Sequence, residues 1–202
     1  MKDSENNLDI GYDVPWPQNG DTLVTDNGDD GLAQTMSQGQ WETYVFSYRR
    51  AAEILVERIE AEPVWVNFMV FPIVFLYRHY LELRLKTLIW DGDAMDAQPA
   101  RRLDNEHGLT SLWHELRPIL EKRFSDCPQS ELDAVEQVLR EFGNLDPKSQ
   151  AARYPIDKSG NPCNLLGIKI NLKKFAETIT RAANFLDSFA DEFTEDDQGN
   201  SC

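Results

Sequence analysis

Residues 77–90 read YRHYLELRLKTLIW, and this stretch decides the predicted fold. It continues an apolar run, residues 64–77, that contains no charged residue. A helix from near Pro72 to Trp90 would be apolar over most of its circumference. Such a helix must be surrounded by others, because each large side chain left in water forfeits about 1.5 to 3 kcal/mol. We therefore predict a buried central helix.

Four further stretches place apolar residues at spacings of three and four, which is the pattern of one helical face. They are residues 41–59, 109–124, 130–142 and 172–193. Ser130 is the predicted N-cap of the fourth helix and Gly143 its end, while Asn171 is expected to cap the last helix. Five helices with mostly short connections predict an all-α antiparallel bundle. The turn-rich segment 146–170 predicts a short irregular or hairpin-like insertion before the last helix.

The acidic residues are concentrated at the two ends of the chain. Residues 1–40 carry a net charge of −7 and residues 191–197 one of −5, which leaves only −3 of the total −15 for the remainder. The predicted domains are a disordered acidic arm over 1–39, a helical bundle over 40–190 and an acidic C-terminal tail over 191–202. A nearly neutral body could still carry a local basic patch.

The sequence predicts a cytoplasmic protein without a membrane partner. The first 20 residues lack the pattern of a signal peptide, and the run 64–77 is shorter than the roughly 20 residues that cross a bilayer. Three cysteines without a C-x-x-C pair indicate neither a disulfide framework nor a zinc site. The common phosphate-loop, dinucleotide, zinc-protease and hydrolase motifs are absent, and the three histidines are scattered. We expect no cofactor and no metal.

Arg78, Glu82 and Lys86 follow one another at intervals of four, so they form a ladder of alternating charge along one stripe of the central helix. Two interpretations are open. The ladder is an ordinary set of ion pairs on a helix surface, or it lies in a cleft where reduced solvation strengthens it and lets Glu82 orient a neighbouring cation.

Three motifs together resemble the HEPN helical-bundle family. They are the Glu82-x-x-x-Lys86 helix, the helix start at His107-Gly-Leu109 and the Arg153-Tyr154-Pro155 loop before the last helix. The resemblance covers about residues 41–190 and implies a helical bundle. Many members are metal-independent ribonucleases of toxin–antitoxin, CRISPR-linked or anti-phage systems, and others are not catalytic.

Catalytic HEPN members carry an Arg followed after four to six residues by a His on a late helix, at a dimer interface. This chain departs from that pattern, since only Arg101 and Arg102 precede a histidine, His107, at such a spacing, and they lie in a predicted loop. If the chain were a nuclease, His107 would act as acid or base, with Arg78, Arg102 or Arg153 stabilising the phosphate. Glu82 would orient these groups, and Lys86 and Tyr154 would be binding residues.

The motifs favour a HEPN-like interaction module without nuclease chemistry, expected to form a homodimer and to bind a protein partner from the same bacterial defence, toxin–antitoxin or stress-response system. RNA binding is weakly supported, because capture of RNA requires a basic surface. Two alternatives remain open. One is a metal-independent endoribonuclease that uses His107, and the other is a structural adaptor whose acidic tails bind a basic partner.

Overall fold

The computed structural model describes residues 41–92, 103 and 105–199, and the single positions Asn19 and Ala33. The predicted N-terminal arm and Arg102 lie outside the described residues, and so does most of the predicted loop before His107. The helices are α1 (Trp41–Ala61), the 3-10 turn η1 (Pro63–Trp65), α2 (Val66–Gly92), α4 (Leu109–Arg123), α5 (Gln129–Leu145) and α6 (Leu172–Gly199). The described part contains five α-helices and no strand, so the predicted all-α bundle is confirmed.

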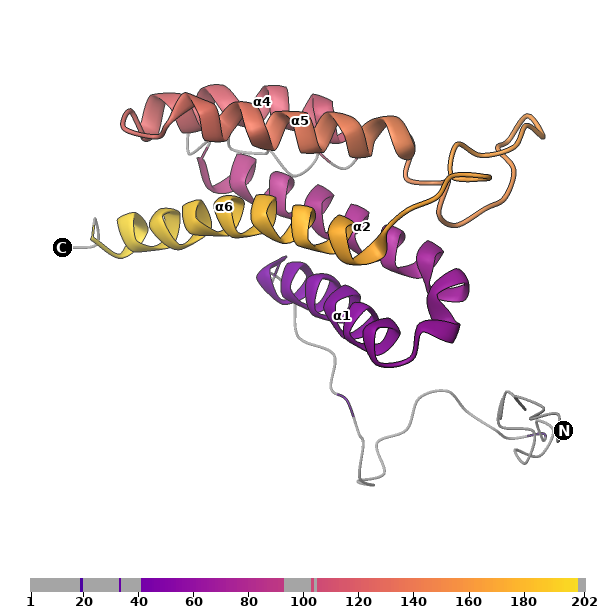
Figure 1. Ribbon diagram of the computed structural model, residues 1–202. Coiled ribbons are helices and arrows are strands. Elements are labelled where there is room, and N and C mark those ends of the chain that lie inside the picture. Colours follow the sequence, from indigo (N-terminus) through magenta and orange to yellow (C-terminus); the bar gives the residue numbers. More distant parts are fainter. Residues whose placement is uncertain (1–18, 20–32, 34–40, 93–102, 104, 200–202) are drawn as a thin grey trace, which may run out of the picture. The chain divides into compact units, whose positions relative to one another are not determined.

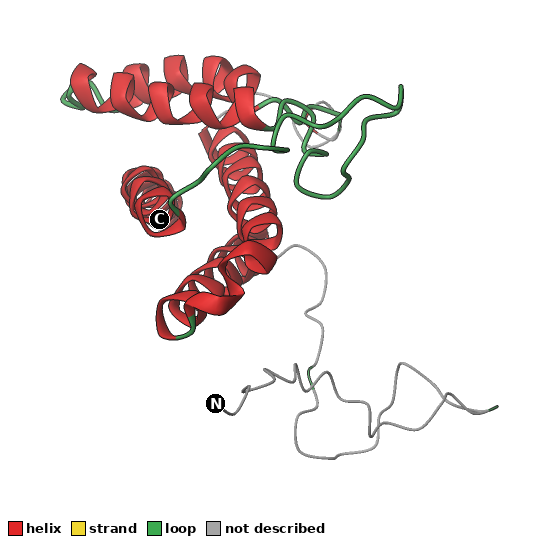
Figure 2. Ribbon diagram, turned by 45° about the vertical axis from the view of Figure 1, so that its right-hand side comes forward, coloured by secondary structure: helices red, strands yellow, loops and turns green. Residues whose placement is uncertain are grey.

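The helices stack in layers around α2. α4 and α5 lie side by side in one layer, α2 and α6 follow beneath them, and α1 lies on the far side of α2 (Figures 1 and 2). α2 contacts α1, α4 and α6. Every residue from Tyr80 to Ile89 is buried, which means that this part of α2 has no solvent-facing side. The predicted central helix is therefore confirmed.

Several predicted helix boundaries were wrong. α2 begins at Val66, so Pro72 lies inside the helix, where its missing N–H removes one backbone hydrogen bond without ending the helix. α5 begins one residue before Ser130, which supplies no side-chain cap, and it runs past Gly143 to Leu145. A Cβ at Gly143 would lie 3.3 Å from Thr110 Oγ1, so this glycine lets α4 pack closely instead of ending α5.

The connection between α5 and α6 has the predicted irregular form. Ile156 and Pro162 form one antiparallel bridge around a turn in which the Asp157 carboxylate accepts hydrogen bonds from the backbone of Ser159 and Asn161. Asn171 caps α6 as predicted, since its Oδ1 accepts a hydrogen bond from Lys174 N at 3.0 Å. α6 continues to Gly199, so the helix does not end at residue 190, the predicted end of the bundle, and it includes most of the predicted tail, residues 191–202.

The continuous helical stretch Pro63–Gly92 is long and apolar enough to cross a membrane by length and composition, which the 14-residue apolar run had not indicated. The core helix of a soluble bundle passes the same test. Arg78, Glu82, Arg84 and Lys86 lie in the second half of this stretch and are buried against protein groups. This burial is the pattern of a core helix in the second half of the stretch, whereas 33% of the apolar 18-residue segment that passes the test is buried.

We predict that Leu85→Ala lowers the free energy of unfolding by about 2 to 5 kcal/mol, because Leu85 is fully buried on α2 and its truncation leaves a cavity. Urea denaturation followed by circular dichroism measures the change. Leu166→Ala is the matched control, since Leu166 is 44% exposed and its truncation should change stability by less than about 1 kcal/mol. Equal losses from the two variants would contradict the central position of α2.

Candidate functional site

The carboxylate of Glu82 is the centre of a buried cluster that we call the Glu82 cluster: Arg78, Glu82, Lys86 and His107. Glu82 Oε1 lies 2.9 Å from Lys86 Nζ and 2.8 Å from His107 Nδ1, and Glu82 Oε2 lies 3.3 Å from Arg78 Nη1. Glu82 is only 3% exposed. The predicted ladder of alternating charge is thus enclosed by the fold. The Glu82 cluster adds His107 to it from outside α2.

Arg78 joins α2 to two other segments. Its side chain is fully buried, and its Nη2 donates a hydrogen bond to the backbone carbonyl of His107, while Nε lies 3.5 Å from the backbone carbonyl of Asp146. The first contact reaches the segment before α4, and the second reaches the end of α5. The guanidinium therefore holds three parts of the chain together from inside the bundle.

The charges of the cluster shift one another's protonation. Burial alone would raise the pKa of Glu82, but the hydrogen bonds from His107 and Lys86 and the charges of Lys86 and Arg78 outweigh it, so the pKa lies below its ordinary value. Burial lowers the pKa of Arg78, and the charges of Glu82 and Asp146 oppose that effect. Glu82 is therefore held in its ionised form, which is the form that the cations and the hydrogen-bond donors around it require.

His107 is the most accessible member of the Glu82 cluster. Its side chain is 55% exposed, while the contact of Nδ1 with Glu82 fixes the ring. A carboxylate that holds one imidazole nitrogen orients the ring so that the other nitrogen is available for proton transfer. The pair Glu82–His107 therefore has a geometry that permits general acid–base chemistry.

Arg153 and Tyr154 lie together but form no direct contact with this pair. Arg153 Nε donates to the backbone carbonyl of Ser149 at 2.8 Å, and the guanidinium lies over the rings of Phe75 and Tyr154, 5.7 and 5.6 Å from their centroids. Within the described part of the chain, Arg153 has no hydrogen bond or ion pair with Glu82 or His107. The alternative in which Arg153 stabilises the phosphate beside His107 therefore stays a prediction.

The prediction also missed two residues beside this region, His79 and Asp146. His79 makes an edge contact with Tyr48 at 4.3 Å and stacks on Phe75 at 5.8 Å, and burial lowers its pKa. Asp146 is 1% exposed, with Oδ1 bound by the backbone N–H groups of Gln150 and Ala151 and Oδ2 without a hydrogen-bond partner among the described residues. The spacing of His79 from Phe75 was visible in the sequence, whereas nothing in it indicated the burial of Asp146.

A second polar cluster, also missed, joins α1, α2 and α6 at Asp187. Tyr80 Oη donates to Asp187 Oδ1 at 3.0 Å, Arg84 Nε lies 2.7 Å from the same oxygen, and Arg49 pairs with Oδ2. Burial and the charge of Asp187 raise the pKa of Tyr80. Arg84 also forms two hydrogen bonds to Glu42, at 2.6 and 2.9 Å, so this cluster fastens α1 and α6 to the central helix.

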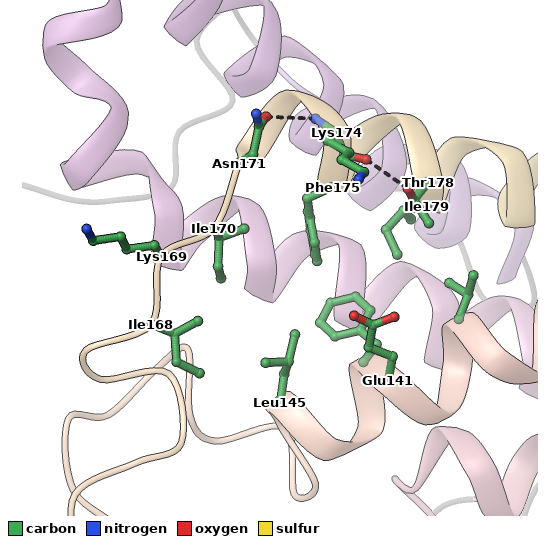
Figure 3. A pocket seen from close by; sticks show the side chains of 12 residues that line it. Glu141, Leu145, Ile168, Lys169, Ile170, Asn171, Lys174, Phe175, Thr178 and Ile179 are labelled. Atoms are coloured by element: carbon green, nitrogen blue, oxygen red, sulfur yellow. Dashed lines mark hydrogen bonds between the residues drawn. The ribbon is translucent and has the colours of Figure 1, made fainter.

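A groove lies between α5, α6 and the segment before α6, and none of the predicted site residues lines it (Figure 3). Metal ligands are not grouped either. Within residues 41–92, 103 and 105–199, no set of three or more His, Cys, Asp or Glu side chains is placed to hold a metal ion.

We predict that Glu82→Gln flattens the acid dependence of stability. Because the folded-state pKa of Glu82 lies below the ordinary value of about 4.3, the unfolded chain binds more protons around pH 4 and the contribution of Glu82 is lost as the pH falls. The free energy of unfolding of the wild type should thus fall more steeply between about pH 5 and pH 3 than that of the variant. Glu177→Gln, at an exposed position on α6, should retain the wild-type slope. Parallel slopes for wild type and Glu82→Gln would refute the prediction.

Comparison with known proteins does not assign the chain to a family. No family model, no curated protein and no solved structure matches the chain. The HEPN resemblance therefore remains a prediction that rests on the residues Glu82, Lys86, His107, Arg153 and Tyr154.

Proposed function

We propose that this chain is a HEPN-like interaction module that forms a homodimer in the bacterial cytoplasm, where it binds a protein partner of a defence, toxin–antitoxin or stress-response system. The observation that carries the proposal is a set of exposed apolar side chains on η1 and the first turns of α2, which we call the α2 patch: Val64, Val66, Phe68 and Phe71. Val64 and Phe68 are 64% and 63% exposed. Exposed apolar surface of this kind marks interaction sites on soluble proteins.

A second copy of the chain is the occupant that we favour for the α2 patch. The patch lies in the run 64–77, which contains no charged residue, whereas the whole chain carries −15. Two copies could therefore approach here with little repulsion between like charges. A two-fold dimer uses the same patch on both subunits, so no second complementary surface is required.

The Glu82 cluster supports an interaction role over a catalytic one. A nuclease needs a cation that can reach the phosphate, yet Arg78 is fully buried and Lys86 is 7% exposed, and both are bound to Glu82. Arg153 is exposed, and within the described residues it forms no hydrogen bond or ion pair with His107. Most of the polar groups that resemble the family motif therefore hold the bundle together.

We predict that Phe68→Asp dissociates the homodimer. A carboxylate in an apolar interface costs several kcal/mol, so the dissociation constant should rise about a hundredfold or more. Sedimentation equilibrium measures it, and circular dichroism should show an intact fold because Phe68 is exposed in the single chain. Ile156→Asp, 55% exposed on the insertion, is the matched control and should leave the dimer intact. A monomeric wild type, or two variants that dimerise equally well, would remove the α2 patch as the interface.

A second candidate function, a metal-independent endoribonuclease, is favoured by one observation: Glu82 orients an imidazole that is more than half exposed. Under this alternative His107→Ala abolishes RNA cleavage in the presence of EDTA, because the only oriented acid–base group of the Glu82 cluster is removed. The matched control is His114→Ala, at an exposed position on α4, which should cleave at the wild-type rate. Background cleavage by all three proteins would exclude the nuclease and is the result that the interaction module predicts.

A further inference from the structure

His79 lies between two aromatic rings that belong to different helices. Tyr48 of α1 meets it edge-on, with ring centroids 4.3 Å apart and an interplanar angle of 88°. Phe75, one turn earlier on α2, stacks on it with centroids 5.8 Å apart and an interplanar angle of 6°. Edge-to-face and offset stacked arrangements are the two that aromatic rings prefer. The imidazole is therefore a packed part of the contact between α1 and α2.

The ring of Phe75 also contacts the insertion between α5 and α6. The guanidinium of Arg153 lies 5.7 Å from the Phe75 centroid, which is the distance of a cation–π contact. Arg153 Nε donates a hydrogen bond to the backbone carbonyl of Ser149 at 2.8 Å, so the guanidinium is tied to its own segment. His79 of α2 and Arg153 of the insertion thus share one aromatic neighbour.

The charged groups around His79 are mostly cations. One anion favours the protonated ring and three cations disfavour it: Glu82, Lys86, Arg78 and Arg153. The anion is already bound by other members of the Glu82 cluster. From α1 the ring meets the phenol of Tyr48, and residues 44, 45, 51 and 52, one turn to either side of Tyr48, carry no charge. A proton on His79 is therefore held in an environment that opposes it.

We propose that His79, Phe75 and Arg153 form an acid-sensitive latch, in which a proton on the His79 ring repels Arg153 and detaches this part of the insertion from α2. At neutral pH the uncharged imidazole and the guanidinium both pack against Phe75. In acid the two become like charges beside one ring. Detachment uncovers Phe75, one turn beyond Phe71 of the α2 patch. The latch is a property of the single chain and does not depend on the proposed homodimer.

The direction of the pH dependence follows from the closed state. Burial, together with the nearby cations, holds the pKa of His79 below its ordinary value of about 6.5 while the latch is closed. When Arg153 leaves and water reaches the ring, the pKa returns toward that value. The open state therefore binds more protons than the closed state, and its population rises as the pH falls through about 6.5.

Amide hydrogen exchange of the ¹⁵N-labelled full chain tests the proposal. The amides of Arg153 and Tyr154 both donate to the backbone carbonyl of Gln150 at 3.0 Å, so they report on this part of the insertion. Their protection factors, which correct for the intrinsic effect of pH on exchange, should fall about threefold or more between pH 7.5 and pH 5.5. Glu82 stays ionised over this range, because its pKa lies below its ordinary value. Constant protection factors would overturn the proposal.

Two variants identify the group that takes up the proton. His79→Phe keeps an aromatic ring in the stack and cannot be protonated, so the protection factors of Arg153 and Tyr154 should be equal at pH 7.5 and pH 5.5. His114→Gln, at an exposed position on α4, is the matched control and should show the fall seen in the wild type. A fall that persists in His79→Phe would assign the opening to another group, for example His107, and the latch would be rejected.

Arg153→Gln supplies a readout that does not require a substitution at His79. The midpoint of the His79 ring C–H titration should move to higher pH in this variant, because one of the opposing cations has been removed. Lys158→Gln removes an exposed cation from another part of the insertion and should leave the midpoint where it is in the wild type. An unchanged midpoint in Arg153→Gln, or equal shifts in the two variants, would show that Arg153 and His79 are not coupled.

Discussion

The structure depends on the need to pair charges that are buried on an otherwise apolar helix. α2 is enclosed from Tyr80 to Ile89, so Glu82 cannot be hydrated and must find its partners inside the protein. Lys86 and Arg78 supply two of them from the same helix, and His107 supplies the third from the segment before α4. His107 links Glu82 to the segment before α4, and Arg78 also contacts the Asp146 carbonyl, so the cluster connects α2 to the start of α4 and to the end of α5.

A second set of paired charges lies elsewhere on the central helix. Arg84 and Tyr80 converge on Asp187 of α6, and Glu42 of α1 closes around Arg84. Apolar packing brings the helices together without specifying their rotation, whereas paired charges do specify it. The two polar clusters leave the start of α2 and the groove between α5 and α6 as apolar surfaces that the fold does not cover. The start of α2 is where we place the partner.

The sequence predicted what depends on local spacing and missed what depends on tertiary contact. Apolar residues at intervals of three and four identified the five helices, and the interval of four joined Arg78, Glu82 and Lys86. The resemblance of the sequence to the HEPN family also associated His107 with this group. The sequence did not indicate that α5 continues through Gly143, because the role of this glycine depends on the approach of Thr110 from α4. The position of Arg153 over Phe75 and Tyr154 likewise depends on how the insertion folds back onto α2.

The central claim is that the buried Glu82 cluster holds α2 in the bundle, and a double-mutant cycle tests it most directly. The free energy of unfolding is measured for the wild type, Arg78→Met, Glu82→Gln and the double variant. If the two side chains act as one buried pair, each single variant leaves a buried charge or donor without its partner. The double variant should then be more stable, by at least about 1 kcal/mol, than the sum of the two single losses predicts. Losses that add to within about 0.5 kcal/mol would show that Arg78 and Glu82 act independently, and the account of the fold would fail.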